Sequence, residues 1–160
     1  MPQAPPLMPA LFYHLTRSTE EDLIRMLITR AVATGWRVML RGTDDAALRR
    51  MDTRLWTDPA DSFVPHGLEG GAQDADQPVL LGKGPATNAA QGVILTGGAV
   101  ADAAEAMGLQ RLWVLFDGAD DTAVTGARAL WRQLTEGGVD AEYWSEDSGK
   151  WAKTAERKAG

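Results

Sequence analysis

The sequence predicts an α/β protein built on a mainly parallel sheet with helices on both faces. Short apolar segments alternate along the chain with longer segments whose apolar residues recur at helical spacing. This alternation favours a parallel sheet, because each helix carries the chain back to the end at which the next strand begins. The chain has 160 residues, of which 44% are hydrophobic. This length and composition fit one domain with one substantial core.

Local signals near the start of the chain predict the first strand and the first helix. Residues 10–15 read ALFYHL, a short apolar run rich in aromatic residues that is typical of a strand. Thr19 is a favourable N-cap, and the acidic residues that follow it stand in the first turn, where the helix dipole favours negative charge. Apolar residues then recur at helical spacing from Leu23, and Gly35 ends the helix.

A second strand and a second helix lead into a long connection. Residues 36–42 read WRVMLRG and predict a strand, and either Asp44 or Asp45 begins a helix that Pro59 ends. Glycines and acidic residues fill the stretch from 60 to 77. Connections longer than about 12–15 residues are usually functional or disordered, so we expect this stretch to carry a function or to lack fixed structure.

The rest of the chain continues the alternation. Strands are predicted over 78–81, 92–96, 110–116 and 141–144, and helices over 100–107 and from Asp120 or Asp121 to about 136. The segment 150–158 is basic and weakly helical in character. We therefore expect a disordered leader over residues 1–9, a single α/β domain over 10–148 and a basic tail over 149–160.

Composition narrows the classes of function. The chain has no cysteine, which excludes a disulfide framework and a thiolate metal site or nucleophile. Two histidines leave little for a metal cluster, so we predict neither a metal nor a cofactor. The net charge of −6 argues against tight direct binding to nucleic acid, which requires neutralised phosphates. With neither a signal peptide nor an apolar run of about 20 residues, we predict a cytoplasmic protein.

Motifs for nucleotide binding and catalysis are incomplete. The GKG segment at 82–84 lacks the Ser or Thr that follows Lys in a P-loop. The Asp pairs at 44–45 and 120–121 follow predicted strands, where a Mg²⁺ site is conceivable, but helix capping explains both pairs without chemistry. We expect His14, on the first strand, to be a buried and hydrogen-bonded residue rather than a catalytic one.

The segment Arg54–Leu68 carries large apolar residues from a helix end into a Gly-rich loop. Trp56, Phe63, Pro65 and Leu68 stand in a region expected near the surface, since loops run over the surface. Such a concentration fits a protein interface with aromatic anchors. It fits equally well a small satellite core that holds the loop down, and the residues alone leave both interpretations open.

The residues of this segment also resemble a known family. RLW at 54–56 followed by SFVPHGL at 62–68 resembles the chi subunit family of bacterial DNA polymerase III. The similarity extends over about residues 10–145. The weaker matching segments, in the order of the family, are Phe12-Tyr13, 35–38, 77–79 and 113–116.

The resemblance implies a three-layer, Rossmann-like fold and a non-catalytic accessory subunit of the clamp-loader assembly. Chi subunits join the clamp loader through the psi subunit and grip the acidic, Phe-ended tail of single-stranded DNA-binding protein. The psi-facing surface is implied around Trp56, Phe63 and Pro65, with His66 nearby. Another clamp-loader protein or a helicase is an alternative partner for this surface.

The tail-binding site is implied at Arg128, Trp131 and Arg132. Helix geometry supports the cluster independently, because residues three and four apart share one flank of a helix. The two arginines can pair with carboxylates, and Trp131 can form an apolar wall for the terminal Phe. Without the resemblance, two solvated arginines beside a half-buried Trp explain the same pattern.

Val124 departs from the family, since better-known relatives carry Lys at this position. The site is then expected to bind more weakly or to recruit a cation from the basic tail. The candidates in the tail are Lys150, Lys153, Arg157 and Lys158.

A different class of function remains as an alternative. Asp44, Asp45 and Asp117 stand at predicted strand ends and could serve a nucleotide- or Mg²⁺-dependent hydrolase. Direct DNA binding would have only the basic tail to rely on, so contact with DNA is expected to be indirect.

Overall fold

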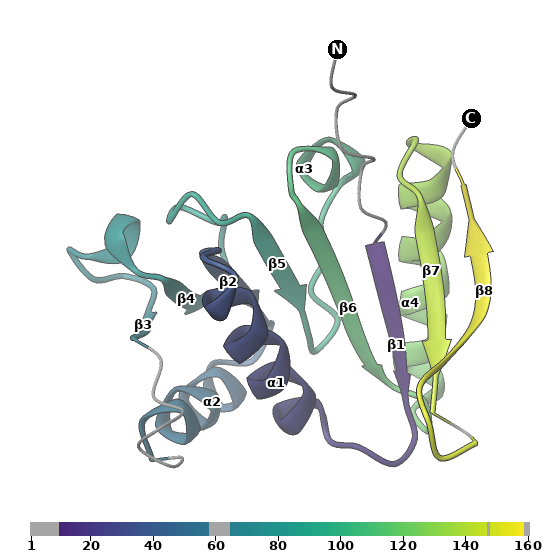
Figure 1. Cartoon of the computed structure of the whole chain (residues 1–160), viewed down its shortest axis with the longest axis horizontal. Helices are drawn as coiled ribbons and strands as arrows, with labels where there is room; N and C mark the ends of the chain where they lie inside the picture. The colour runs from purple at the N-terminus through teal and green to yellow at the C-terminus, as the bar shows by residue number, and fades with distance from the viewer. Residues whose placement is uncertain (1–9, 58–64, 147, 159–160) are drawn as a thin grey trace.

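The computed structural model describes residues 10–57, 65–146 and 148–158, which form one sheet with helices on both faces (Figure 1). The predicted α/β class is confirmed. The elements in chain order are β1 (Ala10–Leu15), α1 (Glu20–Ala33), β2 (Val38–Arg41), α2 (Asp45–Thr57), β3 (Gly67–Leu68), a 3-10 turn (Asp74–Asp76), β4 (Val79–Gly82), β5 (Gly92–Leu95), α3 (Ala103–Met107), β6 (Arg111–Asp117), α4 (Asp121–Glu136), β7 (Ala141–Ser145) and β8 (Ala152–Arg157).

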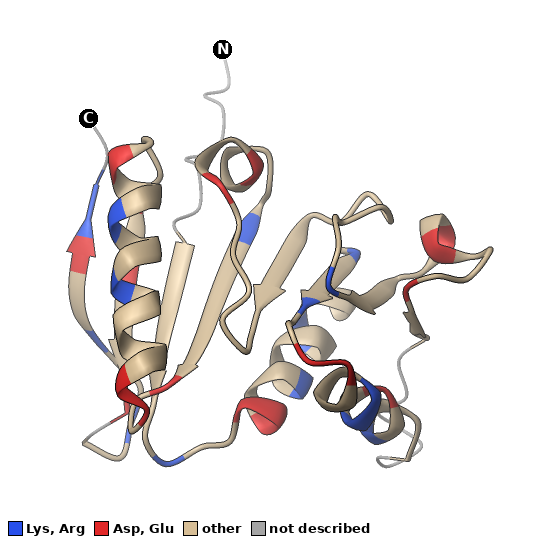
Figure 2. Cartoon of the chain, turned by 180° about the vertical axis from the view of Figure 1, so that it is seen from behind, with Lys and Arg blue, Asp and Glu red and all other residues tan. Residues whose placement is uncertain are grey.

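The sheet is parallel except at one edge. Its strand order is β3-β4-β2-β5-β6-β1-β7-β8, and only the β7–β8 pair is antiparallel. The helices α1 and α2 pack on one face of the sheet, and α4 packs on the other. Figure 1 shows α1 in front of the sheet, and Figure 2, from behind, shows α4 in front. Three layers result, as predicted, and the sheet ends in the two-residue β3 at one edge and in β8 at the other.

The core lies in two layers that follow the alternation of side chains along each strand. One layer packs against α1 and α2 and includes Ile28, Leu40, Ile94 and Leu115. The other packs against α3 and α4; its buried members include Phe12, Met39, Val93, Leu112, Val114, Leu130 and Leu134. The central strands are therefore buried on both faces, as covered parallel strands require.

The predicted starts of α1 and α4 are confirmed at their caps. The Thr19 side chain accepts the Asp22 N–H at 3.1 Å, and the Asp120 carboxylate accepts the N–H groups of Thr122 and Ala123. The helix expected over 100–107 is shorter, because Asp102 caps it by accepting the Glu105 N–H at 2.7 Å. Local capping chemistry thus sets these helix starts.

The prediction of a weakly helical segment over 150–158 is wrong. Residues Ala152–Arg157 form β8, an antiparallel partner of β7. The unpaired edge of β7 supplies backbone hydrogen bonds that a short, solvated helix would have to find by itself, and pairing overrides the weak helical preference.

Two expectations fall partly outside the described part of the chain. These are the leader over 1–9 and the long connection, of which residues 58–64 are not described. The rest of the connection is structured, since β3 pairs in parallel with β4. Among the helices of the described ranges, none is apolar over a length that would cross a bilayer.

Candidate protein-binding surfaces

The helix α4 is anchored to the sheet by one apolar side. Ala127, Leu130 and Leu134 are buried in the core layer beneath the helix. These residues recur three and four positions apart and so form one inward stripe, and Arg128, Trp131 and Arg132 lie beside it on the helix. This packing sets the orientation of the exposed side of α4.

Trp131 lies at the boundary between this core and the surface. Its ring meets Phe12 edge-on at a centroid distance of 5.2 Å and Tyr143 at 6.1 Å. The side chain is only half-buried, so part of the indole remains open to a ligand. Contacts from β1 and β7 hold the ring in place, and no local sequence pattern indicates that Tyr143 supports it.

Arg128 and Arg132 are exposed on the same flank as Trp131. Within the described residues, neither guanidinium group makes a hydrogen bond or an ion pair. Figure 2 shows the basic positions of α4 along the side of the helix that borders β8. Val124 instead is half-buried and packs against the core, so it adds apolar surface at the start of this flank. The structure therefore brings the three predicted residues together, with two unengaged guanidinium groups beside a fixed aromatic ring.

The second predicted surface lies at the other edge of the sheet, where α2 ends beside β3. Trp56 is 55% exposed, Leu68 is 39% exposed, and Pro65 is also exposed. Phe63 lies outside the described residues. Exposed apolar groups near one another on a sheet edge are the arrangement that a protein partner would cover.

His66 supports this surface from below. The residue is 6% exposed, and its Nε2 lies 3.1 Å from both the carbonyl and a carboxylate oxygen of Asp52. The imidazole also contacts the Trp56 indole, with 4.8 Å between ring centroids. His66 therefore positions Trp56 and presents little surface of its own.

The carboxylates at the strand ends each have a partner within the protein. Asp44 accepts the Ala46 N–H at 3.1 Å, Asp45 pairs with Lys83 at 3.1 Å, and Asp117 accepts the Ala119 N–H at 2.9 Å. Asp44 and Asp117 line separate cavities. Across the described residues, no group of three or more acidic or histidine side chains has the arrangement of a metal site.

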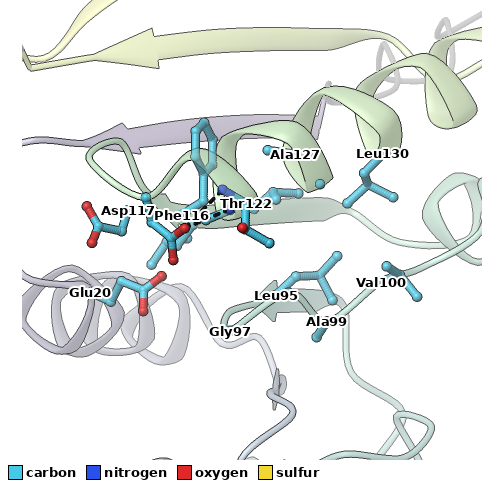
Figure 3. A pocket seen from close by; sticks show the side chains of 16 residues that line it. Glu20, Leu95, Gly97, Ala99, Val100, Phe116, Asp117, Thr122, Ala127 and Leu130 are labelled. Carbon is cyan, nitrogen blue, oxygen red and sulfur yellow. Dashed lines mark hydrogen bonds between the residues drawn. The ribbon is translucent and has the colours of Figure 1, made fainter.

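The cavity at the end of β6 has a volume of about 570 Å³ and lies between α4 and the loop after β5. Figure 3 shows Glu20 and Asp117 at one end and Val100 and Leu130 at the other. Burial raises the pKa of Glu20, a hydrogen bond with Thr96 lowers it, and the negative charge of Asp117 raises it, with a net increase. The cavity is lined by acidic residues and, among the described residues, by no cation, so it repels phosphate groups and does not favour a nucleotide.

The backbone N–H groups of the GKG segment, at the end of β4, bind a side chain of the protein itself. The Glu69 carboxylate accepts the N–H groups of Lys83 at 2.6 Å and Gly84 at 3.2 Å. A Cβ at Gly82 would clash with the Glu69 carboxyl group, so a larger residue there would displace this carboxylate. Backbone donors that a phosphate would use are thus already occupied.

His14 makes the hydrogen bond predicted for it. Its Nδ1 lies 2.6 Å from the hydroxyl oxygen of Tyr143, and the residue is half-buried. The pair connects β1 to β7 and gives the imidazole a structural partner.

Comparisons with known proteins agree on one family. Residues 8–142 match the family model described as DNA polymerase III chi subunit, HolC. DNA polymerase III subunit chi of Escherichia coli strain K12 is 35% identical over 79 residues, which cover 45% of this chain and 54% of that protein. The subunit chi of Pseudomonas aeruginosa is 38% identical over 58 residues, which cover 36% of this chain and 39% of that protein. The chain thus spans about half or less of the curated relatives it matches, and β8 lies beyond the residues matched to the family.

Proposed function

The chain belongs to the DNA polymerase III chi subunit family, and from that premise we propose that it links the clamp-loader assembly to single-stranded DNA-binding protein. In this role it makes and breaks no bond, acts in the cytoplasm and reaches DNA through its protein partner. The observation that carries the proposal is the pair of unengaged guanidinium groups beside the half-buried ring of Trp131.

The chemistry of the α4 flank suits an acidic peptide that ends in an aromatic residue. Arg128 and Arg132 can each donate charge-assisted hydrogen bonds to carboxylates, including the terminal one. Trp131 offers an apolar wall whose position is fixed by Phe12 and Tyr143. A fixed wall lowers the entropic cost of binding, because fewer side chains must be ordered on the protein.

The surface around Trp56 suits a different kind of partner. Its exposed members, Trp56, Pro65 and Leu68, are apolar, and the Trp56 indole rests on a buried His66. A large aromatic side chain on a rigid support is a typical anchor of a protein interface. We assign this surface to the psi subunit or to another clamp-loader or helicase partner.

Titration calorimetry with a peptide from the C-terminal tail of single-stranded DNA-binding protein tests the proposal. We expect binding at micromolar strength that weakens as salt is added, because exposed charges carry part of the contact. The Arg128→Ala variant should bind about tenfold more weakly, since it loses charged hydrogen bonds worth about 1.5 kcal/mol.

Arg49→Ala is the matched control. Arg49 is exposed on α2, on the other face of the sheet, and its removal changes the net charge equally. Its affinity should match that of the original chain. The assignment fails if the peptide does not bind at low salt, or if both arginine variants bind like the original chain.

A further inference from the structure

We propose that β8 forms a second wall of the peptide site on α4 and that Arg157 is the third cation of this site. The inference rests on the proposed function of the α4 flank and adds a contact to it. Three features of β8 carry the argument: its place in the sheet, the different charge of its two faces, and one hydrogen bond to α4.

The strand β8 is an edge of the sheet and is open to a partner. All six of its residues are exposed, and β7 is its only neighbour in the described sheet. It lies outside the residues that match the family model, which end at 142. A contact made by β8 is therefore a property of this chain that the family match does not supply.

One hydrogen bond joins β8 to the end of α4. The Arg157 guanidinium donates from Nη1 to the Thr135 hydroxyl oxygen at 3.2 Å. The same hydroxyl donates to the Trp131 carbonyl at 2.8 Å and approaches the Arg132 carbonyl at 3.3 Å. The Thr135 hydroxyl thus connects Arg157 to the turn of α4 that carries Trp131 and Arg132 of the peptide site.

The pairing register explains why Arg157 faces α4. Arg157 stands opposite Ala141, and Ala155 stands opposite Tyr143. Both β7 residues belong to the core layer beneath α4. Since directly paired residues share a face of the sheet, Ala155 and Arg157 are on that same side. The small side chain of Ala155 leaves the exposed flank near Tyr143 uncovered.

The two faces of β8 differ in charge. On the face away from α4, Lys153 is paired with Glu156 at 3.1 Å and lies 3.9 Å from Glu142. On the α4 side, Arg157 makes no ion pair with any described carboxylate, and neither do Arg128 and Arg132. Three unpaired guanidinium groups on one side of a chain with net charge −6 select an acidic ligand.

This arrangement fits an acidic peptide that runs along the flank between α4 and β8. Val124 puts an apolar side chain at the start of the flank, and Arg157 adds a cation at the opposite end of α4. The peptide's carboxylates would therefore be drawn toward the C-terminal end of α4. Of the four basic tail residues considered from the sequence, Arg157 is the one that the structure connects to α4.

The test uses the full chain and the same acidic tail peptide in titration calorimetry. Arg157→Ala should weaken binding by about fivefold and reduce its salt dependence, because one charged contact is lost. Lys153→Ala removes the same charge from the opposite face of the same strand. It should change the affinity by less than about twofold, as expected for an exposed charge outside the contact.

Two more variants keep the test independent of the stability of β8. Arg157→Lys keeps the charge without the planar donor geometry and should bind with intermediate strength. Ala155→Glu leaves Arg157 in place and adds a carboxylate to the α4-facing side, so binding should fall at least tenfold through repulsion. Melting temperatures of all variants show whether the fold is kept.

The outcomes separate this inference from the proposed function. If Arg128→Ala weakens binding but Arg157→Ala and Ala155→Glu do not, β8 is no part of the site while the proposed function stands. Equal losses in Arg157→Ala and Lys153→Ala would show a long-range charge effect only and would overturn the assignment. Absence of binding to the original chain would overturn both.

Discussion

The carboxylate of Glu146 holds the loop between β1 and α1. Its Oε1 accepts the backbone N–H groups of Thr16, Arg17 and Ser18 at 3.0, 2.8 and 2.7 Å, and its Oε2 accepts the Ser18 hydroxyl at 2.8 Å. Glu146 is 5% exposed. Burial by itself raises the pKa of this carboxyl, but the hydrogen bonds from residues 16–18 lower it further, and the net pKa lies below the ordinary value.

Replacement of Glu146 by Ala should therefore reduce the free energy of unfolding by about 2–4 kcal/mol, because three backbone N–H groups and one hydroxyl lose a charged acceptor. Urea denaturation followed by circular dichroism measures the change. Glu136→Ala, at an exposed position, is the control and should stay within about 0.5 kcal/mol of the original chain. A loss of unfolding free energy as small as that of the control would show that water accepts these hydrogen bonds as well as the carboxylate does.

The same carboxyl predicts a dependence of stability on pH. Since its folded-state pKa is depressed, its contribution is present above the pKa of the unfolded chain and is lost as pH falls through the folded-state pKa. The difference in unfolding free energy between the original chain and Glu146→Gln should therefore shrink under acid conditions. Urea titrations at a series of acid pH values measure it, and a difference independent of pH would contradict the assignment.

The short helix α3 is fastened to β2 by an ion pair. Arg41 is 7% exposed and donates to both carboxylate oxygens of Glu105, at 2.8 and 2.7 Å. It also donates to the carbonyls of Gly84 and Val100. One side chain thus connects β2 to α3 and to the loops that precede and follow β5.

Glu105→Ala should destabilise the fold by about 2–4 kcal/mol, because it leaves a buried guanidinium without its carboxylate. Thermal and urea unfolding measure the loss. Asp45→Ala breaks an exposed pair with Lys83 and should cost less than about 1 kcal/mol. Similar losses of unfolding free energy in the two variants would mean that water solvates the Arg41 guanidinium after Glu105 is removed.

The elements that sequence reasoning placed correctly are those with local causes. The caps at Thr19 and Asp120 involve residues two or three positions away, and helical spacing alone put Arg128 and Arg132 on one flank with Trp131. These local signals do not depend on contacts between segments that are distant in the sequence.

The features that were missed or misjudged depend on contacts between distant segments. The strand β8 has the composition of a weak helix, but the edge of β7 gives it hydrogen-bond partners. Glu146 binds a loop 128 to 130 residues away in sequence. The burial of His66 likewise follows from how β3 packs on α2, and no local sequence pattern indicates it.

The two proposed surfaces lie at opposite edges of the sheet. Trp56 and Leu68 flank the β3 edge, whereas Arg128 and Arg157 flank the β8 edge (Figure 1). The strands β4, β2, β5, β6, β1 and β7 separate the two edges. Central strands that are buried on both faces resist deformation. We therefore expect that a ligand bound at one edge does not change the structure of the surface at the other edge.

The chain should therefore bind both partners at once, without competition. The affinity for the acidic tail peptide, measured with and without saturating psi subunit, should agree within about twofold, since a larger factor would mean a coupling free energy above about 0.4 kcal/mol. Trp56→Ala should weaken psi binding and leave peptide binding unchanged, and Arg128→Ala should do the reverse. Displacement of the peptide by psi would place both contacts on one surface and would contradict the arrangement at two edges.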